Sequence, residues 1–423
     1  MVEMKSGYKM TEVGVIPEDW EVKELSSISA IKSGKRLPKG SLVTSSKTSY
    51  PYIRVIDMNM GYLNLSNIMY VPENVQPMIS KYIISKNDIY ISVAGTLGLV
   101  GKIPEELDGA NLTENANRIT DIKCNIKFLM YWLMSSKIQG LINQTQTLGA
   151  QPKLALTRIR NFPIILPPIE EQEQIAEVLC NVDTLITNLR KLIRKKKDIR
   201  QGTMQMLVTG KKRLSGFDGN WRVTTLDQLC YIVTKQTGFD YSAEIKPSLV
   251  TTPQIGTIPF IQNKDFEAFD INYNTDFFIP YDVAEKYPRI LLNEVCLLIS
   301  ISGRIGNVAI FDNEQTSFAG GAVGIAKLYE PELASWCMLY LSSKDGQEQI
   351  FSNEKVGAQH NLTVADVRKF EIKMPAKSER EAIIKVLTDM NDEIEVLEEK
   401  LDKYQKIKQG MMEELLTGKV RLV

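Results

Sequence analysis

The chain has 423 residues, 43% of them hydrophobic, which predicts two or three domains with buried cores. Lysine and arginine balance aspartate and glutamate at 51 each, which argues against a protein that coats nucleic acid nonspecifically. The five cysteines form no CxxC pair, and a single histidine excludes a His-rich metal site. No apolar run is long enough for a membrane span or a signal peptide, so we expect a cytoplasmic protein.

A first globular domain is predicted over residues 1–168. Short β-rich runs at 52–56 and 89–93, separated by Gly, Asn and Pro turns, are typical of a small mixed domain. The loop at 32–39 carries four cations on a flexible backbone, which suits DNA phosphates or guanine edges as well as a solvated surface. The candidate DNA-binding residues here are Lys32, Lys35, Arg36, Lys39, Arg54 and Thr96.

A central helix is predicted over residues 169–214. Its apolar residues recur at alternating steps of four and three, which is the a/d seam of a coiled coil. About forty residues without proline would extend ~60 Å at 1.5 Å per residue. The seam residues are Ile175, Leu179, Val182, Ile186, Leu189 and Ile193.

A second globular domain is predicted over residues 215–376, and a C-terminal helix and tail over 377–423. The domain has its own β-rich run at 295–300, and its candidate DNA-binding residues are Lys235, Gln236, Lys264 and Arg304. The second helix repeats the stripe of the first at Ile383, Leu387, Met390, Ile394, Leu397 and Leu401.

The second half of the chain repeats the first at a shift of 208 residues. The matching segments are 95–98 with 303–306, 149–151 with 357–359, and 209–211 with 417–419. The period is about half the chain, so the sequence predicts a duplicated domain rather than a solenoid. Because Gln151 and Gln359 occupy the same place in both copies, a shared role in the fold or at the DNA backbone is favoured over variable base readout.

Neither apolar stripe can bury itself, so the two helices are expected to pack on each other. The basic stretch 190–200 would meet mixed charges in a parallel pair but Asp389, Asp392 and Glu393 in an antiparallel one, which favours the antiparallel orientation. The expected fold is α+β, with two tandem globular domains separated by an antiparallel coiled coil and related by a pseudo-twofold axis. Because duplex DNA has twofold axes perpendicular to its own axis, each domain could read half of an asymmetric, bipartite site.

Four motifs resemble signatures of the specificity subunits of Type I restriction–modification systems: 16–20 (IPEDW), 149–154 (GAQxxL), 166–172 (LPPIEEQ) and 416–419 (LTGK). The resemblance covers nearly the whole chain and includes the order domain, helix, domain, helix. The second copy departs from the pattern, because 374–380 lacks the second proline and the glutamine of 166–172. This leaves open whether both helix starts engage a partner in the same way.

The resemblance implies a non-catalytic subunit that recognises double-stranded DNA through two target-recognition domains. It further implies that two DNA-methyltransferase subunits bind this chain, that ATP-dependent restriction subunits join them, and that no membrane is involved. S-adenosylmethionine, ATP and magnesium are then expected only on the partner subunits, so no cofactor or metal is expected on this chain.

Two other classes of protein remain open from the residues alone. A coiled-coil scaffold that never touches DNA would show the same helices. A methyltransferase or nuclease would need its own motifs: residues 371–373 (EIK) resemble the E-x-K arm of a metal nuclease, but their counterpart at 163–165 is PII. No GxGxxG cofactor turn occurs.

Overall fold

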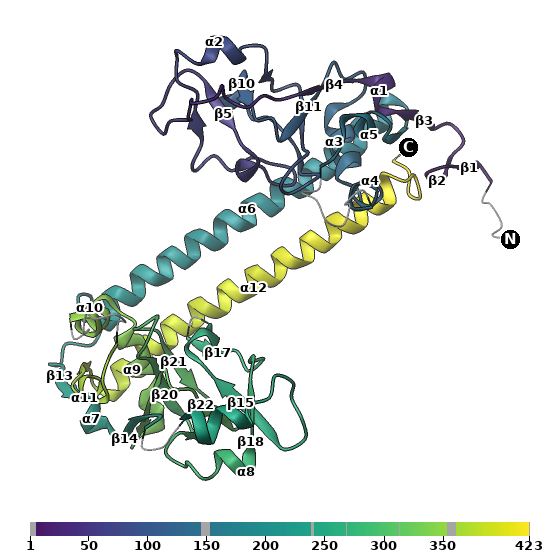
Figure 1. Ribbon diagram of the computed structural model, residues 1–423. Helices are drawn as coiled ribbons and strands as arrows, with labels where there is room; N and C mark the ends of the chain where they lie inside the picture. Colours follow the sequence, from purple (N-terminus) through teal and green to yellow (C-terminus); the bar gives the residue numbers. More distant parts are fainter. Residues whose placement is uncertain are drawn as a thin grey trace. The chain divides into compact units, whose positions relative to one another are not determined.

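The structure is a computed structural model that describes residues 6–144, 153–237, 241–267, 269–312, 314–352 and 361–422 (Figure 1). Residue contacts divide the chain into two compact units, Met1–Lys191 with Glu399–Val423, and Leu192–Glu398. Each unit therefore contains one globular domain together with a part of each of two long helices. None of the described helices combines the length and the apolar character that a membrane crossing needs.

The globular part of the first unit is built on two four-stranded sheets. The antiparallel sheet has the order β4-β11-β8-β9, and the mixed sheet has the order β6-β5-β10-β7, in which β5 and β10 are parallel. The strands are β4 (Ala30–Ser33), β11 (Ala116–Thr120), β8 (Ile89–Ser92), β9 (Val100–Lys102), β6 (Met69–Tyr70), β5 (Pro51–Ile53), β10 (Ala110–Leu112) and β7 (Ile83–Ile84).

Helix α3 (Ile126–Met134) contributes six consecutive buried residues to this unit's core. The side chain of Asn125 accepts hydrogen bonds from the backbone N–H groups of Lys127 and Phe128, which satisfies donors that the first turn would otherwise leave open. Residues 128–133 are all buried, so the helix is apolar on every side, as expected of a core helix. The other helices of the domain are α1 (Leu25–Ile28), α2 (Gln76–Ile79), α4 (Ser136–Asn143) and α5 (Leu156–Arg160).

The second unit repeats this topology with its own strands. The antiparallel sheet β14-β23-β20-β21 matches β4-β11-β8-β9, and the sheet β18-β15-β22-β19 matches β6-β5-β10-β7, including one parallel pair, β15 with β22. Duplication of the domain is thereby confirmed. The strands are β14 (Cys230–Lys235), β23 (Val323–Leu328), β20 (Cys296–Ser300), β21 (Val308–Phe311), β18 (Phe278–Pro280), β15 (Thr257–Ile261), β22 (Ser317–Ala319) and β19 (Leu291–Leu292). The helices are α7 (Leu226–Leu229), α8 (Tyr281–Ala284), α9 (Ala334–Leu341), α10 (Lys344–Ser352) and α11 (Val364–Arg368).

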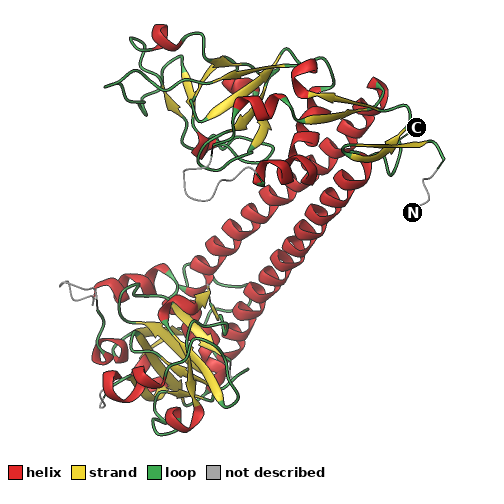
Figure 2. Cartoon of the chain, turned by 45° about the vertical axis from the view of Figure 1, so that its right-hand side comes forward, coloured by secondary structure: helices red, strands yellow, loops and turns green. Residues whose placement is uncertain are grey.

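Two-stranded ribbons tie the start of each domain to the strand that precedes its helix. Figure 2 shows the strands of the chain in yellow and its helices in red. In the first unit β3 (Glu21–Glu24) pairs with β12 (Pro163–Leu166), and in the second β13 (Arg222–Thr225) pairs with β24 (Glu371–Met374). Both pairings are antiparallel. Smaller ribbons join β1 (Tyr8–Thr11) to β2 (Gly14–Pro17) and β16 (Phe266–Glu267) to β17 (Asp270–Ile271).

The long helices are α6 (Ile169–Val208) and α12 (Lys377–Leu415), and their segments run antiparallel within each unit. In the first unit Asp183 Oδ1 lies 2.7 Å from Lys408 Nζ, and residue 171 meets residue 421 further along. In the second unit Lys196 Nζ lies 2.6 Å from Glu393 Oε1. Residue numbers therefore rise along one helix as they fall along the other, which confirms the predicted orientation.

The predicted seam is the face that the helices bury. Eight of the twelve seam residues are buried, and Val182, Met390, Leu397 and Leu401 are half-buried. The expected charge pairing is confirmed for Glu393, but Asp389 pairs instead with Lys385 on its own helix, at 3.1 Å. Asp389 and Lys385 are four residues apart, which brings them together on the same helix face. The buried seam residues are Ile175, Leu179, Ile186, Leu189, Ile193, Ile383, Leu387 and Ile394.

Candidate nucleic-acid interface

The basic loop of the first domain combines paired and unpaired cations. Arg36 Nε lies 2.5 Å from Glu114 Oε1, which raises the pKa of the guanidinium, and Lys32 lies 3.4 Å from Asp121. Lys35 Nζ lies 5.6 Å from the centre of the Tyr82 ring. Exposed pairs of this kind contribute little stability because water screens both charges, so phosphates can compete for these cations. Lys39 is exposed and makes no ion pair with any described residue.

A tight turn holds Arg54 in the first domain and Lys264 in the second. Arg54 donates through Nε and Nη2 to the buried carboxylate of Asp57, at 3.0 and 2.7 Å, and also to the carbonyl of Asn67. Lys264 Nζ lies 3.1 Å from Asp265 and 2.8 Å from Asp276. Both predicted DNA-binding residues therefore stabilise their own turn, a role that the sequence analysis did not foresee.

The glycine loops 95–98 and 303–306 lie next to these turns. A Cβ atom added to Gly95 would lie 3.9 Å from Val55, and one added to Gly303 would lie 3.5 Å from Asn263. The Asn263 amide also donates to the carbonyl of Ser302, at 2.8 Å. Each domain thus brings the turn and the glycine loop together, and the predicted residues Thr96 and Arg304 are exposed there.

The basic loop joins the same part of the first domain through the backbone. The N–H of Lys35 donates to the carbonyl of Leu112, and the N–H of Thr113 donates to the carbonyl of Ile53, directly before the turn. In the second domain Gln236 replaces this loop, and its amide donates to the carbonyl of Ala319 at 2.9 Å. Lys235 is half-buried at the end of β14. We define the candidate edge of each domain as the turn and the glycine loop, together with the basic loop in the first domain and with Gln236 in the second.

Gln151 and Gln359 lie outside the described residues. The role of the candidate edge in DNA binding stays a prediction for Lys32, Lys35, Arg36, Lys39, Arg54, Thr96, Lys235, Gln236, Lys264 and Arg304.

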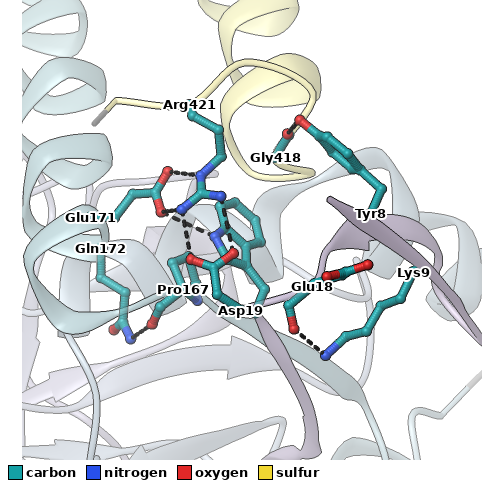
Figure 3. A network of polar contacts seen from close by, with 10 residues as sticks. Tyr8, Lys9, Glu18, Asp19, Pro167, Glu171, Gln172, Gly418 and Arg421 are labelled. Carbon is teal, nitrogen blue, oxygen red and sulfur yellow. Dashed lines mark hydrogen bonds and ion pairs between the residues drawn. The ribbon is translucent and has the colours of Figure 1, made fainter. Parts of the chain in front are cut away.

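A second arrangement, repeated in both units, joins the start of each domain to the helices. In the first unit Glu171, only 3% exposed, accepts hydrogen bonds from Trp20 Nε1 at 3.0 Å and from Arg421 Nε at 2.7 Å (Figure 3). Arg421 also donates to both carboxylate oxygens of Asp19, at 3.0 and 2.8 Å, which lowers the pKa of Asp19. The guanidinium lies 5.6 Å from the Trp20 ring centre. We call these four residues the first clamp.

The second unit contains the same arrangement with one carboxylate fewer. Trp221 Nε1 donates to Glu379 Oε2 at 3.0 Å, and Arg213 donates to both carboxylate oxygens of the buried Glu379. The guanidinium lies 5.4 Å from the Trp221 ring centre. Asn220 occupies the place of Asp19. We call Arg213, Trp221 and Glu379 the second clamp.

The sequence contains the repeated segments of both clamps, but no local pattern in it pairs them. The usable signal was that Trp20, Glu171 and the TGKxR segment each have a counterpart in the other copy. The departure at the second helix start is also visible: Gln172 donates to the carbonyl of Pro167 and accepts from the N–H of Asn125, whereas its counterpart Arg380 is a buried cation.

Comparison with known proteins follows the same division of the chain. The family model described as the Type I restriction modification DNA specificity domain matches residues 17–197 and again 219–408. A provisionally named type I restriction enzyme specificity subunit, MjaX, from Methanocaldococcus jannaschii is 27% identical over 99% of this chain and 97% of its own length. The MjaVIII specificity subunit of the same organism is 25% identical over 96% of this chain and 94% of its own length.

Two solved structures share the fold. A chain from a study of complex assembly and conformational transition in the type I R-M system aligns with a TM-score of 0.59 at 15% identity, covering 96% of this chain and 99% of its own. The Type-I restriction-modification S subunit from M. genitalium aligns with a TM-score of 0.50 at 17% identity, covering 97% and 99%. With both of its globular domains and most of both helices inside the matched ranges, the chain belongs to the Type I restriction–modification DNA specificity family and is a specificity subunit with two tandem specificity domains.

Proposed function

We propose that this chain recognises an asymmetric, bipartite DNA sequence, one half-site per domain, and holds the partner subunits of a Type I restriction–modification complex. One observation carries the proposal: the chain contains two complete specificity domains with the same topology but different side chains at the candidate edge. Different side chains at equivalent places favour different bases in the two half-sites.

In this proposal the partner subunits perform the methylation and cleavage reactions of the complex. Methyltransferase subunits would supply S-adenosylmethionine, and restriction subunits would supply ATP hydrolysis and magnesium-dependent cleavage. Two equivalent units support two methyltransferase subunits, one for each unit. This chain would then bind, orient and select the DNA.

The test is an exchange of one domain. Residues 17–167 would be replaced by the matching domain of a relative with a different target, and the chain would be assembled with its methyltransferase partners. Sequencing of the methylated DNA should show one half-site changed and the other retained, because each domain has its own sheets and core. If both half-sites changed together, independent readout would be wrong. If the methylated sequence stayed the same, the scaffold interpretation would replace this one.

The matched control exchanges residues 219–375 instead. It should alter the opposite half-site, and assembly of the complex should be equal for both exchanges. A loss of assembly in either one would show that the exchanged domain carries the partner surface rather than the sequence selection.

A further inference from the structure

The glycine loops of the two domains are held by the same backbone contacts. The N–H of Gly98 donates to the carbonyl of Ser92 at 2.9 Å, and the N–H of Gly306 donates to the carbonyl of Ser300 at 3.0 Å. The hydroxyl of each buried serine accepts from the residue after the loop, Leu99 or Asn307, at 2.8 Å. Each loop is therefore closed by one buried serine.

A helix fixes the second glycine of each loop from the other side. Gln139 on α4 donates to the carbonyl of Gly98 at 3.0 Å, and Gln347 on α10 donates to the carbonyl of Gly306 at 2.9 Å. Both of these glycines have positive φ, 75° and 90°. A Cβ atom on either one would lie 2.9 Å from a neighbouring side-chain atom. The positions accept only glycine without rearrangement, so the loop backbone is pre-organised.

Of the two residues between the glycines, the first is exposed and the second is half-buried. Leu97 and Ile305 pack against the cores of their domains. Thr96 and Arg304 are exposed, and Arg304 makes no hydrogen bond or ion pair with any described residue. In this respect Arg304 differs from Arg54 and Lys264, whose cations are held by carboxylates of their own domain.

The two loops share their backbone contacts but carry different side chains. This difference favours a contact with a base over a contact with a phosphate. A phosphate contact common to both half-sites would require the same reach from both loops, but threonine ends one bond beyond Cβ whereas arginine reaches several bonds further. The guanidinium fork can donate to O6 and N7 of guanine together, and threonine offers one hydroxyl and one methyl group. The pair therefore fits two half-sites that differ at one base position.

We propose that positions 96 and 304 are equivalent specificity-determining positions, and that Arg304 recognises a guanine edge in the major groove of the second half-site. This rests on the proposed function. Thr96 contacts the corresponding base of the first half-site. The glycine loop supplies a fixed backbone in both domains, and the residue after its first glycine sets the preferred base.

The test uses the chain assembled with its methyltransferase subunits and compares Arg304→Ala with the wild type. Binding selection at low salt and sequencing of methylated DNA should show relaxed preference at one G·C pair of the second half-site. Discrimination at that pair should fall about 5- to 150-fold, as expected for loss of a bidentate base contact. The first half-site should be unchanged. Arg222→Ala, which removes an exposed cation from the β13–β24 ribbon, is the control and should leave every position unchanged.

A uniform loss of affinity would overturn the proposal. In that case the slope of log K against log salt would fall by about one with the recognised sequence intact, which is the signature of a lost phosphate contact. An unchanged affinity and sequence would overturn it too.

A second variant tests the other loop. Thr96→Arg should alter the preferred base at one position of the first half-site and leave the second half-site intact, and a retained preference there would contradict the equivalence of the two positions. The domain exchange keeps the two proposals apart: if the exchange changes one half-site while Arg304→Ala changes none, only the assignment of positions 96 and 304 fails.

Discussion

The two units place a cation at the same position of their helix pair and neutralise it differently. In the first unit Lys408 Nζ lies 2.7 Å from Asp183, whose other oxygen accepts a hydrogen bond from the Tyr131 hydroxyl at 2.7 Å. The counterpart of Lys408 in the second unit is Arg200, which lies 5.2 Å from the ring centre of Phe269. Asn391 and Leu339 stand where the first unit has Asp183 and Tyr131.

The difference shows in the energetics of the two cations. Burial lowers the pKa of Arg200, and its Nε atom is buried without a hydrogen-bond partner among the described residues. A ring face attracts a cation by about 0.5–2 kcal/mol, but it does not satisfy an N–H donor. Lys408 Nζ also lies 5.4 Å from the Tyr131 ring centre, so both units place a cation beside a ring and differ in whether a carboxylate accompanies it. The two clamps follow the same trend, since the first holds its arginine with two carboxylates and the second with one.

The largest effect is expected at the clamps. Glu379→Ala should destabilise the second unit more than any of the substitutions below, because it leaves Arg213 and Trp221 without their buried acceptor. Glu171→Ala should cost less in the first unit, because Asp19 still holds Arg421. Hydrogen exchange along the first turns of α12 and α6 would report each loss separately. Equal losses would mean that the additional carboxylate has no role in stability.

Asp183→Asn should make the first unit resemble the second. The substitution removes the negative charge that Lys408 and the Tyr131 hydroxyl share, and we expect a loss of roughly 1–3 kcal/mol because Lys408 is largely buried. Urea unfolding followed by the signal of the first unit would measure it. Asp402→Asn, which removes an exposed i,i+4 pair with Lys406, is the control and should change stability by less than ~0.5 kcal/mol.

Asn391→Asp is the reverse change in the second unit. A carboxylate at this position would face Arg200 and could accept its unsatisfied N–H, so a gain of roughly 0.5–1 kcal/mol is expected. The gain should disappear in an Arg200→Met background, which removes the cation while keeping a long apolar side chain. A gain that persisted there would have another cause.

The smallest effect is expected in the dependence of the first unit's stability on pH. Arg421 lowers the pKa of Asp19, so the folded state favours the ionised carboxylate; the stabilisation is present above the unfolded pKa and is lost as pH falls through the folded pKa. Asp19→Asn should therefore reduce the stability of the first unit at neutral pH by less than ~1 kcal/mol, since Asp19 is exposed. At pH values below the folded-state pKa of Asp19 the variant and the wild type should converge. A difference that persisted in acid would contradict an electrostatic origin.

The sequence predicted the parts of the fold that depend on local patterns. Helix periodicity identified both seams, because in a regular helix the spacing of residues in the sequence determines which face they occupy. The charges around Lys196 and Glu393 indicated the antiparallel orientation. The shift of 208 residues identified the duplication. These inferences need no knowledge of how distant loops meet.

Side-chain pairing across the chain could not be predicted in this way. Glu171 and Arg421 are 250 residues apart, and nothing in either segment specifies the other. The turns are an intermediate case. Arg54 and Asp57 are only three residues apart, so the sequence contains the signal for their pairing. The same positive charge also suits DNA, and charge alone does not distinguish the two roles.

The first clamp has a consequence for the order in which the two units are completed during synthesis. The second unit consists of one continuous segment, Leu192–Glu398, whereas the first unit also needs residues 399–423. On the ribosome, the domain that emerges first therefore waits for Arg421, and Glu171 and Trp20 lack their partner until the second unit has been synthesised. The second unit is therefore complete in sequence before the last segment of the first unit is added, and the first clamp is the later of the two to be assembled.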